Sequence, residues 1–335
     1  MRQNRSEPNH PPVRPGRLLV RLFGKNWDLA VAEIESVLGR LVARDDNLLL
    51  VEARADLGRL RRLGLSTLVA EFVGQGSATQ LDFDVESLLT STYSVRVHRR
   101  PTSMRISTDN LADLVWRRRG AGRVDLANPA VALHAFVVQD KIWWGRKIID
   151  FESGEFVARA PRQRPFWRSV SIDPRTSRAL VNLANPPLRG SVLDPFCGTG
   201  SFLVEATLMG FEAFGSDIDR RVVAGAKANL DYEGVSADVR MIDARDLGAW
   251  KSSFDALVTD VPYGRSASTH GVDSADLYDA FLRSASSVMV RGGRMVVITR
   301  AGTLPQLPPS MRALRQILMP SHESMTRSID VIERI

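Results

Sequence analysis

The chain has 335 residues, of which 45 are lysine or arginine, 38 are aspartate or glutamate and 44% are hydrophobic. This composition is that of an ordinary globular protein, and the length predicts two or three domains. The single cysteine, Cys197, excludes an intramolecular disulfide and a cysteine-based zinc cluster, and the five histidines are too scattered to indicate a metal site. We therefore expect no bound metal and a cytoplasmic location, where thiols stay reduced. No apolar run approaches the roughly 20 residues that cross a bilayer, so no membrane partner is expected.

The charge is distributed unevenly along the chain. Residues 1–190 contain 30 lysines and arginines against 20 acidic residues, whereas residues 191–335 contain 15 against 18. A basic module joined to a nearly neutral one is typical of a protein that binds nucleic acid with one part and a smaller ligand with the other. A basic surface that only keeps the protein soluble explains the charge equally well, so the charge by itself leaves both interpretations open.

The first 75 residues predict a small α+β domain. Residues 1–16 mix proline, arginine and asparagine without an apolar stretch, which is typical of a disordered tail and not of a signal peptide. After the tail, the predicted elements are a strand at 17–23, a helix at 27–38, hairpin strands at 40–44 and 48–53, a helix at 57–63 and a strand at 68–73. The order βαββαβ is the ferredoxin-like pattern, so residues 17–75 are expected to form a ferredoxin-like domain.

A second α+β region is expected at residues 76–152. Its predicted elements are a helix at 84–89, a basic strand at 93–99, a helix at 110–118 and a hairpin with strands at 131–138 and 141–148. Thr108 or Asp109 is the predicted cap of the second helix. Residues 153–168 are expected to form an irregular, arginine-rich linker, whose aromatic side chains either pack on neighbouring domains or contact RNA.

From residue 169 to 335 short apolar strands alternate with helices. The predicted strands are 191–194, 212–217, 239–242, 256–259 and 294–299, and the predicted helices are 176–184, 201–209 and 220–232. Such alternation predicts an α/β fold with a parallel, doubly wound sheet of the Rossmann type. A ligand of such a sheet binds in the crevice at the carboxyl ends of the strands.

The first of these strands runs into the turn Asp194-Pro195-Phe196-Cys197-Gly198-Thr199-Gly200, directly ahead of an apolar helix. The two glycines let the backbone approach a ligand closely, and the amino terminus of the helix offers free N–H groups. The turn lacks the third glycine of a dinucleotide-binding turn and the lysine of a phosphate-binding loop, which argues against a dehydrogenase and an NTPase. An acid at the strand end would repel a pyrophosphate, but it suits the ammonium group of an amino acid.

Two further acids follow the next two strands. Asp217, with Ile218 after it, ends the second strand nineteen residues after Gly198, at the spacing where α/β nucleotide binders hold ribose hydroxyls. Asp243, with Ala244 after it, follows the third strand and could accept a hydrogen bond from an exocyclic adenine amine. Each acid could be a structural cap, but acids at the ends of three successive strands favour an adenosyl amino acid, S-adenosylmethionine, as the ligand.

The fourth strand runs into Asp260-Val261-Pro262-Tyr263, a string that by itself commonly forms a turn. Beside the expected ligand crevice it has a sharper meaning, because it closely matches the D/N-P-P-Y motif of methyltransferases that act on exocyclic amino groups of nucleobases. Such an amine is a poor nucleophile, since its lone pair is delocalised into the ring. The Asp260 carboxylate and the Val261 carbonyl can hold the two amine hydrogens while Tyr263 stacks on the base, so methyl transfer needs positioning and no metal.

These motifs resemble those of a known family. Residues 186–335 resemble class I S-adenosylmethionine-dependent RNA methyltransferases, and the chain from residue 17 resembles the THUMP-containing tRNA guanine-N2-methyltransferases that modify nucleotide 10 of tRNA. The resemblance outside the catalytic motifs is carried by Tyr93-Ser94-Val95-Arg96-Val97, Val124-Asp125-Leu126-Ala127-Asn128-Pro129, Trp144-Gly145-Arg146, Arg164-Pro165-Phe166 and Asp173-Pro174-Arg175. It implies a THUMP domain at 76–152 and a class I methyltransferase domain at 169–335.

The resemblance also implies a role for each motif. The turn from Asp194 to Gly200 would contact the methionine part of the cofactor, Asp217 and Ile218 the ribose, Asp243 and Ala244 the adenine, and the segment from Asp260 to Tyr263 the target guanine. The family has proline where this chain has Val261. Because the chemistry uses the carbonyl of that residue, we expect the exchange to loosen the loop without abolishing catalysis.

The partner implied by the resemblance is tRNA, which a THUMP domain recognises largely through its backbone and shape. The candidate phosphate contacts, each of which could also be merely exposed, are Arg96, Arg99, Arg100, Arg146 and Lys147. The triplet 117–119 is expected to be a solvated helix face. The eukaryotic branch of the family uses a small activating subunit and the archaeal branch acts alone, and we expect this chain to act alone.

Two other functions stay open at the level of sequence. An amino-methyltransferase that acts on rRNA guanine, or on DNA adenine or cytosine, would use the same motif, although the THUMP-like front half argues against DNA. A catalytically inactive RNA-binding scaffold would fit the basic front half, but the intact carboxylates and glycines of the motifs argue against inactivity.

Overall fold

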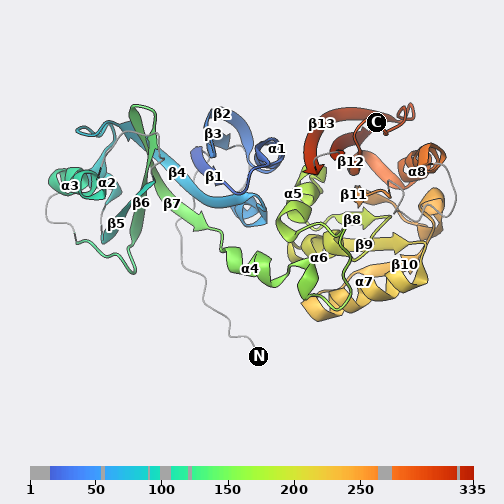
Figure 1. The fold of residues 1–335 in the computed structure, drawn as a ribbon. Helices are drawn as coiled ribbons and strands as arrows, with labels where there is room; N and C mark the ends of the chain where they lie inside the picture. Colours follow the sequence, from blue (N-terminus) through green and yellow to red (C-terminus); the bar gives the residue numbers. More distant parts are fainter. Residues whose placement is uncertain are drawn as a thin grey trace. The chain divides into compact units, whose positions relative to one another are not determined.

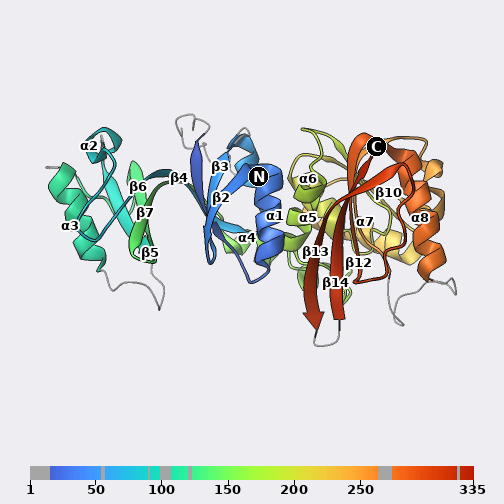
Figure 2. The same ribbon diagram turned by 90° about the horizontal axis from the view of Figure 1, so that it is seen from above.

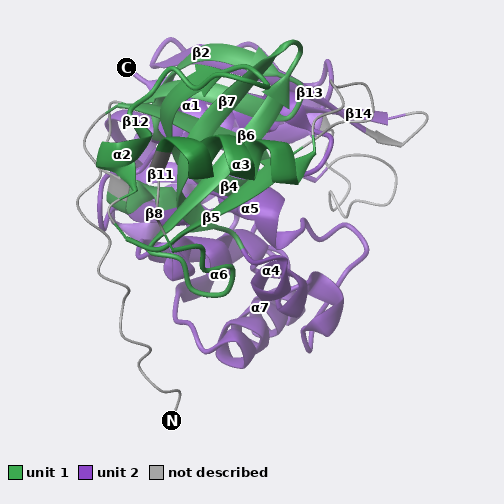
Figure 3. Ribbon diagram, turned by 90° about the vertical axis from the view of Figure 1, so that its left-hand side faces the viewer, with its two compact units in different colours: residues 1–23, 38–60, 66–151 green, residues 24–37, 61–65, 152–335 purple. Residues whose placement is uncertain are grey.

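A computed structural model describes residues 16–53, 57–89, 91–98, 107–119, 123–262, 274–322 and 325–335. The chain divides into two compact units, which Figure 3 distinguishes by colour. Unit 1 comprises Met1–Phe23, Leu38–Leu60 and Ser66–Phe151, and unit 2 comprises Gly24–Val37, Arg61–Leu65 and Glu152–Ile335. Two short stretches of the front half therefore belong with the carboxyl-terminal half. In the described residues, no helix is long and apolar enough to span a membrane.

Within the described residues, unit 1 contains a seven-stranded sheet with the order β2-β3-β1-β4-β7-β6-β5. The strands are β1 (Arg17–Leu22), β2 (Gly39–Asp45), β3 (Leu48–Ala53), β4 (Ser66–Gly76), β5 (Tyr93–His98), β6 (Val131–Val138) and β7 (Lys141–Asp150). β4 is eleven residues long and pairs antiparallel with β1 on one side and β7 on the other. The strands predicted for residues 17–75 and for residues 76–152 thus form one continuous sheet.

The short helices of unit 1 differ in detail from the sequence prediction. The helix expected at 57–63 is the 3-10 helix η1 (Leu57–Arg62). The helix expected at 84–89 is α2 (Val85–Leu88), and its cap is Asp84, whose side chain accepts from two backbone N–H groups. α3 (Thr108–Arg119) begins at Thr108, the first of its two predicted caps, and Ser107 instead accepts from the Asn110 N–H at 3.0 Å. Serine is a favoured capping residue, so the prediction of Thr108 or Asp109 was wrong by one or two positions.

Unit 2 contains, in the described residues, a second seven-stranded sheet with the order β10-β9-β8-β11-β12-β14-β13 (Figures 1 and 2). Its strands are β8 (Ser191–Asp194), β9 (Glu212–Asp217), β10 (Asp238–Met241), β11 (Phe254–Asp260), β12 (Met289–Arg300), β13 (Met311–His322) and β14 (Met325–Arg334). The strands from β10 to β12 are parallel, whereas β14 is antiparallel to β12 and to β13. The predicted strands are thus parallel, and the sheet continues into two antiparallel strands, β14 and β13, which the sequence analysis did not predict. β13 and β14 form a hairpin, which needs no crossover helix, so the pattern of predicted helices gave no sign of these two strands.

The order of the parallel strands places a switch point between β8 and β11. The chain leaves β8 through α6 (Ser201–Leu208) and α7 (Arg220–Glu233) toward β10, and it returns to β11 before continuing through α8 (Ser274–Val288) to β12. Because such crossovers are right-handed, α6 and α7 lie on one face of the sheet and α8 on the other. The crevice outside the strand ends at a switch point is where doubly wound sheets bind ligands.

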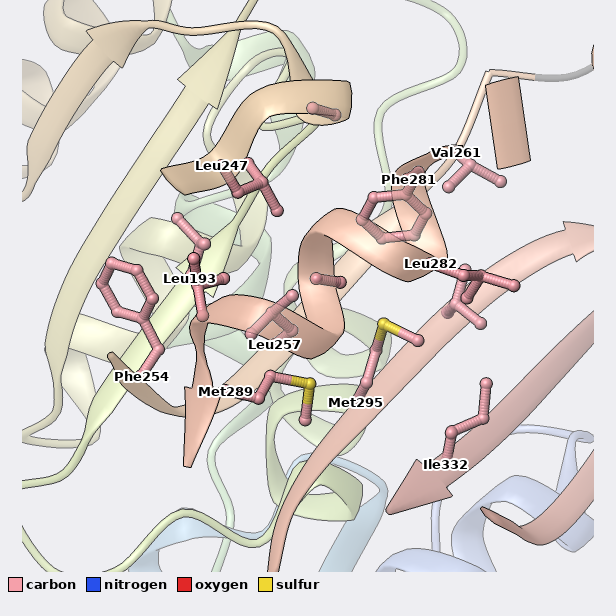
Figure 4. Close-up of a cluster of buried hydrophobic side chains, with 14 of the residues drawn as sticks. Leu193, Leu247, Phe254, Leu257, Val261, Phe281, Leu282, Met289, Met295 and Ile332 are labelled. Carbon is pink, nitrogen blue, oxygen red and sulfur yellow. The ribbon is translucent and has the colours of Figure 1, made fainter. Parts of the chain in front are cut away.

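The face under α8 is closed by a cluster of buried apolar side chains that includes the 3-10 helix η3 (Ala244–Trp250) (Figure 4). Leu257 of β11 and Met295 and Val297 of β12 pack there against Phe281 and Leu282 of α8. Met295 and Val297 are alternate residues of β12 and therefore face the same layer, as the two-residue period of a strand requires. The cluster fixes α8 against the carboxyl-terminal part of β11.

The remaining helices of unit 2 include α1 (Trp27–Val37) and α5 (Pro174–Ala184), which contact each other. Glu33 of α1 is fully buried and accepts hydrogen bonds from the Gly64 N–H at 2.7 Å, the Leu65 N–H at 2.9 Å and the Asn182 amide at 2.7 Å. Burial raises the pKa of Glu33, against the effect of these donors. This carboxyl group explains why residues 61–65 and α1 belong to unit 2.

The arginine-rich linker is more ordered than its sequence indicated. It begins with α4 (Ser153–Ala158) and continues through the 3-10 helix η2 (Pro161–Gln163). The Phe156 ring of α4 lies under the guanidinium groups of Arg159, Arg175 and Arg178, at 5.1, 4.1 and 5.0 Å from the ring centre. Arg159 and Arg178 also pair with the buried carboxylate of Glu205. These arginines hold α4 against α5 and α6 within unit 2.

Candidate active site

Three carboxylates end neighbouring parallel strands at the switch point. Asp194 is the last residue of β8, Asp217 of β9 and Asp260 of β11. Since these strands are parallel, the three side chains lie at the same edge of the sheet. Their charges act on one another, because both Asp217 and Asp260 raise the pKa of Asp194. The structure therefore brings together three of the acids that the sequence singled out.

Asp194 is the most deeply buried of the three. Its side chain is 1% exposed, and its Oδ1 accepts from the Thr259 hydroxyl at 2.7 Å and from the Phe196 N–H at 3.2 Å. Burial, with the neighbouring carboxylates, raises its pKa to about 8, although both hydrogen bonds oppose the shift. A buried carboxyl group of this kind releases its proton when a cation binds beside it, which suits the ammonium group of an amino acid.

The turn after Asp194 has the backbone conformation that its glycines allow. Gly198 and Gly200 have φ angles of +50° and +79°, which other residues rarely adopt. The Cys197 N–H donates to the Ser216 carbonyl at 2.8 Å, and the Gly198 N–H donates to the Asp217 carboxylate at 3.3 Å. These bonds tie the turn to the end of β9. Burial holds the pKa of the Cys197 thiol well above its usual range, so this side chain fills space and is no nucleophile.

The other residues of the turn are divided between packing and hydrogen bonding. Pro195 is buried, and the Phe196 ring meets the Phe281 ring edge-on with the centres 5.2 Å apart. The Thr199 hydroxyl lies 3.0 Å from the Ser171 hydroxyl. Gly200 is the cap of α6, whose first backbone N–H groups face the turn. The Phe196 ring and the Thr199 hydroxyl thus hold the turn to residues outside it.

Asn229 of α7 is a further residue of the site, which the sequence analysis missed. Its amide donates to the Thr199 carbonyl at 2.9 Å and to the Phe166 carbonyl at 2.6 Å, and its Oδ1 accepts from the Phe166 N–H at 2.9 Å. The side chain is fully buried. A signal was present, because Asn229 is a polar residue in the stripe of α7 that contains Val222 and Ala226. Asn229 joins the linker to the glycine turn.

The linker motif Arg164-Pro165-Phe166 docks against α7 and the start of α6. Arg164 is 4% exposed and forms an ion pair with Glu233 at 2.9 Å. Its guanidinium group also donates to the Ser201 hydroxyl at 3.4 Å. A Cβ atom on Gly225 would lie 2.3 Å from the Phe166 ring, so only glycine allows this ring to approach. The motif therefore supports the glycine turn, and of the two interpretations of the linker the packing one holds for Arg164 and Phe166.

The acid of β9 lies at the rim of the site. Asp217 accepts from the Asp219 N–H at 3.0 Å in addition to the bond from the turn, and burial raises its pKa. Ile218 is 45% exposed, an unusual exposure for an isoleucine next to a strand end. This pair presents a carboxylate beside an apolar surface.

Asp243 caps η3 and has a partner that the sequence analysis did not foresee. Its carboxylate accepts from the Arg245 N–H at 2.9 Å, and both of its oxygens accept from the Arg245 guanidinium group. A ligand amine at Asp243 would have to share this carboxylate with Arg245. Ala244 is buried in the cluster under α8.

The segment after β11 is anchored. The Val261 N–H donates to the Ile298 carbonyl of β12 at 3.2 Å, and the Val261 side chain is 1% exposed in the cluster under α8. The expectation that valine loosens this loop stays a prediction, but the Val261 N–H makes a bond to Ile298 that proline, which has no N–H, could not make. The Pro262 carbonyl accepts from the Tyr278 hydroxyl at 2.9 Å. Tyr263 lies outside the described residues.

The predicted RNA contacts that the structure describes, Arg96, Arg146 and Lys147, lie in unit 1. Arg96 is exposed on β5 and makes no ion pair with the described residues. Arg146 pairs with Glu71 at 2.5 Å, and Lys147 pairs with Asp150 at 3.1 Å, so each of these charges is partly neutralised. Arg99 and Arg100 lie outside the described residues.

Comparisons with known proteins agree with this architecture. The family model UPF0020, described as an RMKL-like methyltransferase domain, matches residues 161–319. The tRNA (guanine(10)-N2)-dimethyltransferase of Methanothermobacter thermautotrophicus is 34% identical over 82% of this chain and 84% of its own length. The protein of the same name from Pyrococcus abyssi is 31% identical over 83% of this chain and 87% of its own length.

A solved structure extends the likeness of fold to nearly the whole chain. The crystal structure of TrmN from Thermus thermophilus covers 96% of this chain and 100% of its own, with a TM-score of 0.53 at 20% identity. The fold and the shared sequence thus agree along both units. The chain belongs to the tRNA (guanine(10)-N2)-dimethyltransferase family.

Proposed function

We propose that the protein transfers methyl groups from S-adenosylmethionine to N2 of the guanosine at position 10 of tRNA. The observation that carries the proposal is the set of carboxylates Asp194, Asp217 and Asp260 at the ends of neighbouring strands around a switch point, with a glycine turn beside them. The relatives from M. thermautotrophicus and P. abyssi, which this chain matches over most of its length, are named for this reaction.

The residues present fit S-adenosylmethionine. Asp194 is a buried carboxyl group with a raised pKa, and it would hold the amino-acid ammonium group. The backbone of the glycine turn would hold the methionine carboxylate, and Asp217 and Ile218 would hold the ribose and flank the adenine. Asp243 and Ala244 would complete the adenine end, with Arg245 fixing the Asp243 carboxylate. When bound, the cofactor supplies an electrophilic methyl group on a sulfonium centre.

Asp260 and Val261 would activate the target amine. The Asp260 carboxylate and the Val261 carbonyl accept its two hydrogens and localise the lone pair on nitrogen, while Tyr263 stacks on the base. Held in this way, the nitrogen would be positioned to accept the methyl group that the bound cofactor would supply. The surplus proton would then leave to Asp260 or to water. The proposed scheme uses no metal and no covalent enzyme intermediate.

Unit 1 would bind the tRNA. Its sheet order β2-β3-β1-β4 is that of a ferredoxin-like unit, and the part from α2 to β7 corresponds to the proposed THUMP domain. Arg96 is the candidate phosphate contact with the least neutralisation, followed by Arg146 and Lys147 beside their acidic partners. Arg99 and Arg100 complete the proposed set. We propose that the protein needs no activating subunit.

The test uses the full chain, labelled cofactor and unmodified tRNA transcripts, followed by nucleoside analysis. We expect label in N2-methylated guanosine, and loss of that label in a transcript with adenosine at position 10. Asp260→Ala should abolish transfer while cofactor binding, measured by calorimetry, is retained. Label in adenosine or cytidine, or wild-type transfer by Asp260→Ala at saturating cofactor, would contradict the proposal.

A further inference from the structure

The segment after β11 is held by hydrogen bonds to two other elements, β12 and α8. On one side the Val261 N–H donates to Ile298 of β12, which extends the β11–β12 pairing one residue beyond the acid. On the other side the Tyr278 hydroxyl of α8 donates to the Pro262 carbonyl at 2.9 Å. Neither Tyr278 nor α8 was predicted from the sequence, because the motif analysis ended at the loop before α8.

Tyr278 is well suited to act as a permanent donor. It is 2% exposed and belongs to the same buried cluster as Val261 and Phe281. Burial raises the pKa of its hydroxyl, and the charge of Asp260 raises it further, against a hydrogen bond with Thr303. The hydroxyl therefore keeps its proton at neutral pH. Because the side chain is buried, water cannot easily replace the bond to Pro262 if the hydroxyl is removed.

The two anchors constrain the peptide between them. The Val261 carbonyl belongs to the Val261–Pro262 peptide, and the flanking peptides are fixed through the Val261 N–H and the Pro262 carbonyl. The pyrrolidine ring of Pro262 fixes one of the remaining torsions, and the buried, β-branched side chain of Val261 restricts another. The direction of the Val261 carbonyl is thus determined by contacts on both sides.

We propose that Tyr278 is a positioning residue for methyl transfer, which holds the Pro262 carbonyl so that the neighbouring Val261 carbonyl is aimed at the target amine. The inference rests on the proposed function, because it assigns Tyr278 to the same site. Tyr278 contacts no reacting atom in this scheme. Its effect is on the geometry of the acceptor, to which in-line transfer is sensitive at the scale of about 1 Å.

The test compares Tyr278→Phe with Ser286→Ala in the full chain. Tyr278→Phe keeps the ring and removes only the hydroxyl. Ser286 lies on the same helix and is 7% exposed, and its hydroxyl is 2.6 Å from that of Ser310, so Ser286→Ala removes a buried hydroxyl away from the loop. Transfer to tRNA transcripts gives kcat and KM, calorimetry gives the Kd of S-adenosylmethionine, and thermal unfolding gives Tm.

We expect Tyr278→Phe to lower kcat about tenfold, with the Kd of the cofactor and the KM for tRNA within about twofold of wild type. Ser286→Ala should lower Tm by about as much as Tyr278→Phe does, and it should leave kcat unchanged. Wild-type kcat in Tyr278→Phe would overturn the inference, as would an equal fall of kcat in Ser286→Ala. Failure of the proposed function looks different, because the wild-type protein itself would then place no label in guanosine.

Discussion

The side-chain amide of Asn229 donates a hydrogen bond to the Thr199 carbonyl across 2.9 Å. The same amide group also donates to the Phe166 carbonyl and accepts from the Phe166 N–H. One buried side chain thus links the linker before the methyltransferase sheet to the turn that would hold the cofactor. Gly198 and Gly200, which flank Thr199 in this turn, have no side chains of their own with which to hold the backbone in place. Its conformation therefore depends on partners such as Asn229.

Asn229→Ala should weaken cofactor binding. The substitution leaves the Thr199 carbonyl and both backbone groups of Phe166 without their partner, at a cost on the order of 1–3 kcal/mol for each buried group, and the turn is free to shift. We expect the Kd of S-adenosylmethionine to rise about tenfold, as measured by calorimetry.

Asn182→Ala is the matched control for that measurement. Asn182 is 3% exposed and likewise donates to two acceptors, the Glu33 carboxylate and the Arg62 carbonyl, but it has no bond to the turn. It should lower Tm without changing the Kd. Equal losses of affinity in the two variants would mean that Asn229 acts only through general stability.

Cofactor binding should release a proton near neutral pH. The pKa of Asp194 is raised from 3.8 to about 8, so at pH 7 the carboxyl group is largely protonated in the free protein. An ammonium group beside it would favour the carboxylate and expel that proton. Calorimetric titrations in buffers with different ionisation enthalpies should show release of up to about one proton at pH 7.

The same group makes the free protein less stable at higher pH. The pKa of Asp194 is higher in the folded than in the unfolded state. Its contribution to the free energy of unfolding is therefore full below pH 3.8 and is lost as the pH rises to about 8. Asp194→Asn should remove both the proton release and this part of the pH dependence of Tm. An unchanged proton release in Asp194→Asn would assign it to another group.

Acid should destabilise the sheet of unit 1. Arg21 donates to His98 Nδ1 at 3.2 Å, so His98 donates from Nε2 to His134 Nδ1 at 2.8 Å, and both rings are neutral. Burial lowers the pKa of each ring to about 4, aided for His98 by Arg21 and for His134 by His98. The unfolded state therefore binds more protons, and stability is lost as the pH falls from 6.5 to about 4.

Native-state hydrogen exchange of β5 and β6 peptides should reveal this loss as a fall in protection between pH 6.5 and 4. His134→Gln removes one titrating group and should reduce the pH dependence of the protection. The same dependence in His134→Gln and in the wild type would show that the histidine pair is not its source.

Val261→Pro should lower stability although it restores the family motif. Proline removes the N–H that donates to Ile298 and leaves that carbonyl without this partner, in a place where the Val261 side chain is 1% exposed. We expect a decrease of about 1–3 kcal/mol in the free energy of unfolding, measured by urea denaturation. A more stable Val261→Pro variant would show that the rigidity of proline outweighs the hydrogen bond.

The sequence by itself determined the elements whose causes are local. A short apolar strand followed by an acid and two glycines predicts the turn at 194–200, and φ angles of +50° and +79° show why glycine is needed there. The alternation of strands and helices predicts the doubly wound sheet, and parallel pairing then brings Asp194, Asp217 and Asp260 to one edge. These conclusions need only residue spacing and the short reach of the chain.

Tertiary structure alone decided the contacts between residues that are distant in the chain. Asn229 meets Thr199, Tyr278 meets Pro262 and Arg164 meets Glu233 because helices pack on a particular face of the sheet. The long strand β4 joins two predicted domains into one sheet. The hydrogen bonds of Glu33 link α1 to residues 61–65 within unit 2. Such choices depend on which surfaces the whole chain can bury together with all their polar groups paired, and no local pattern contains that information.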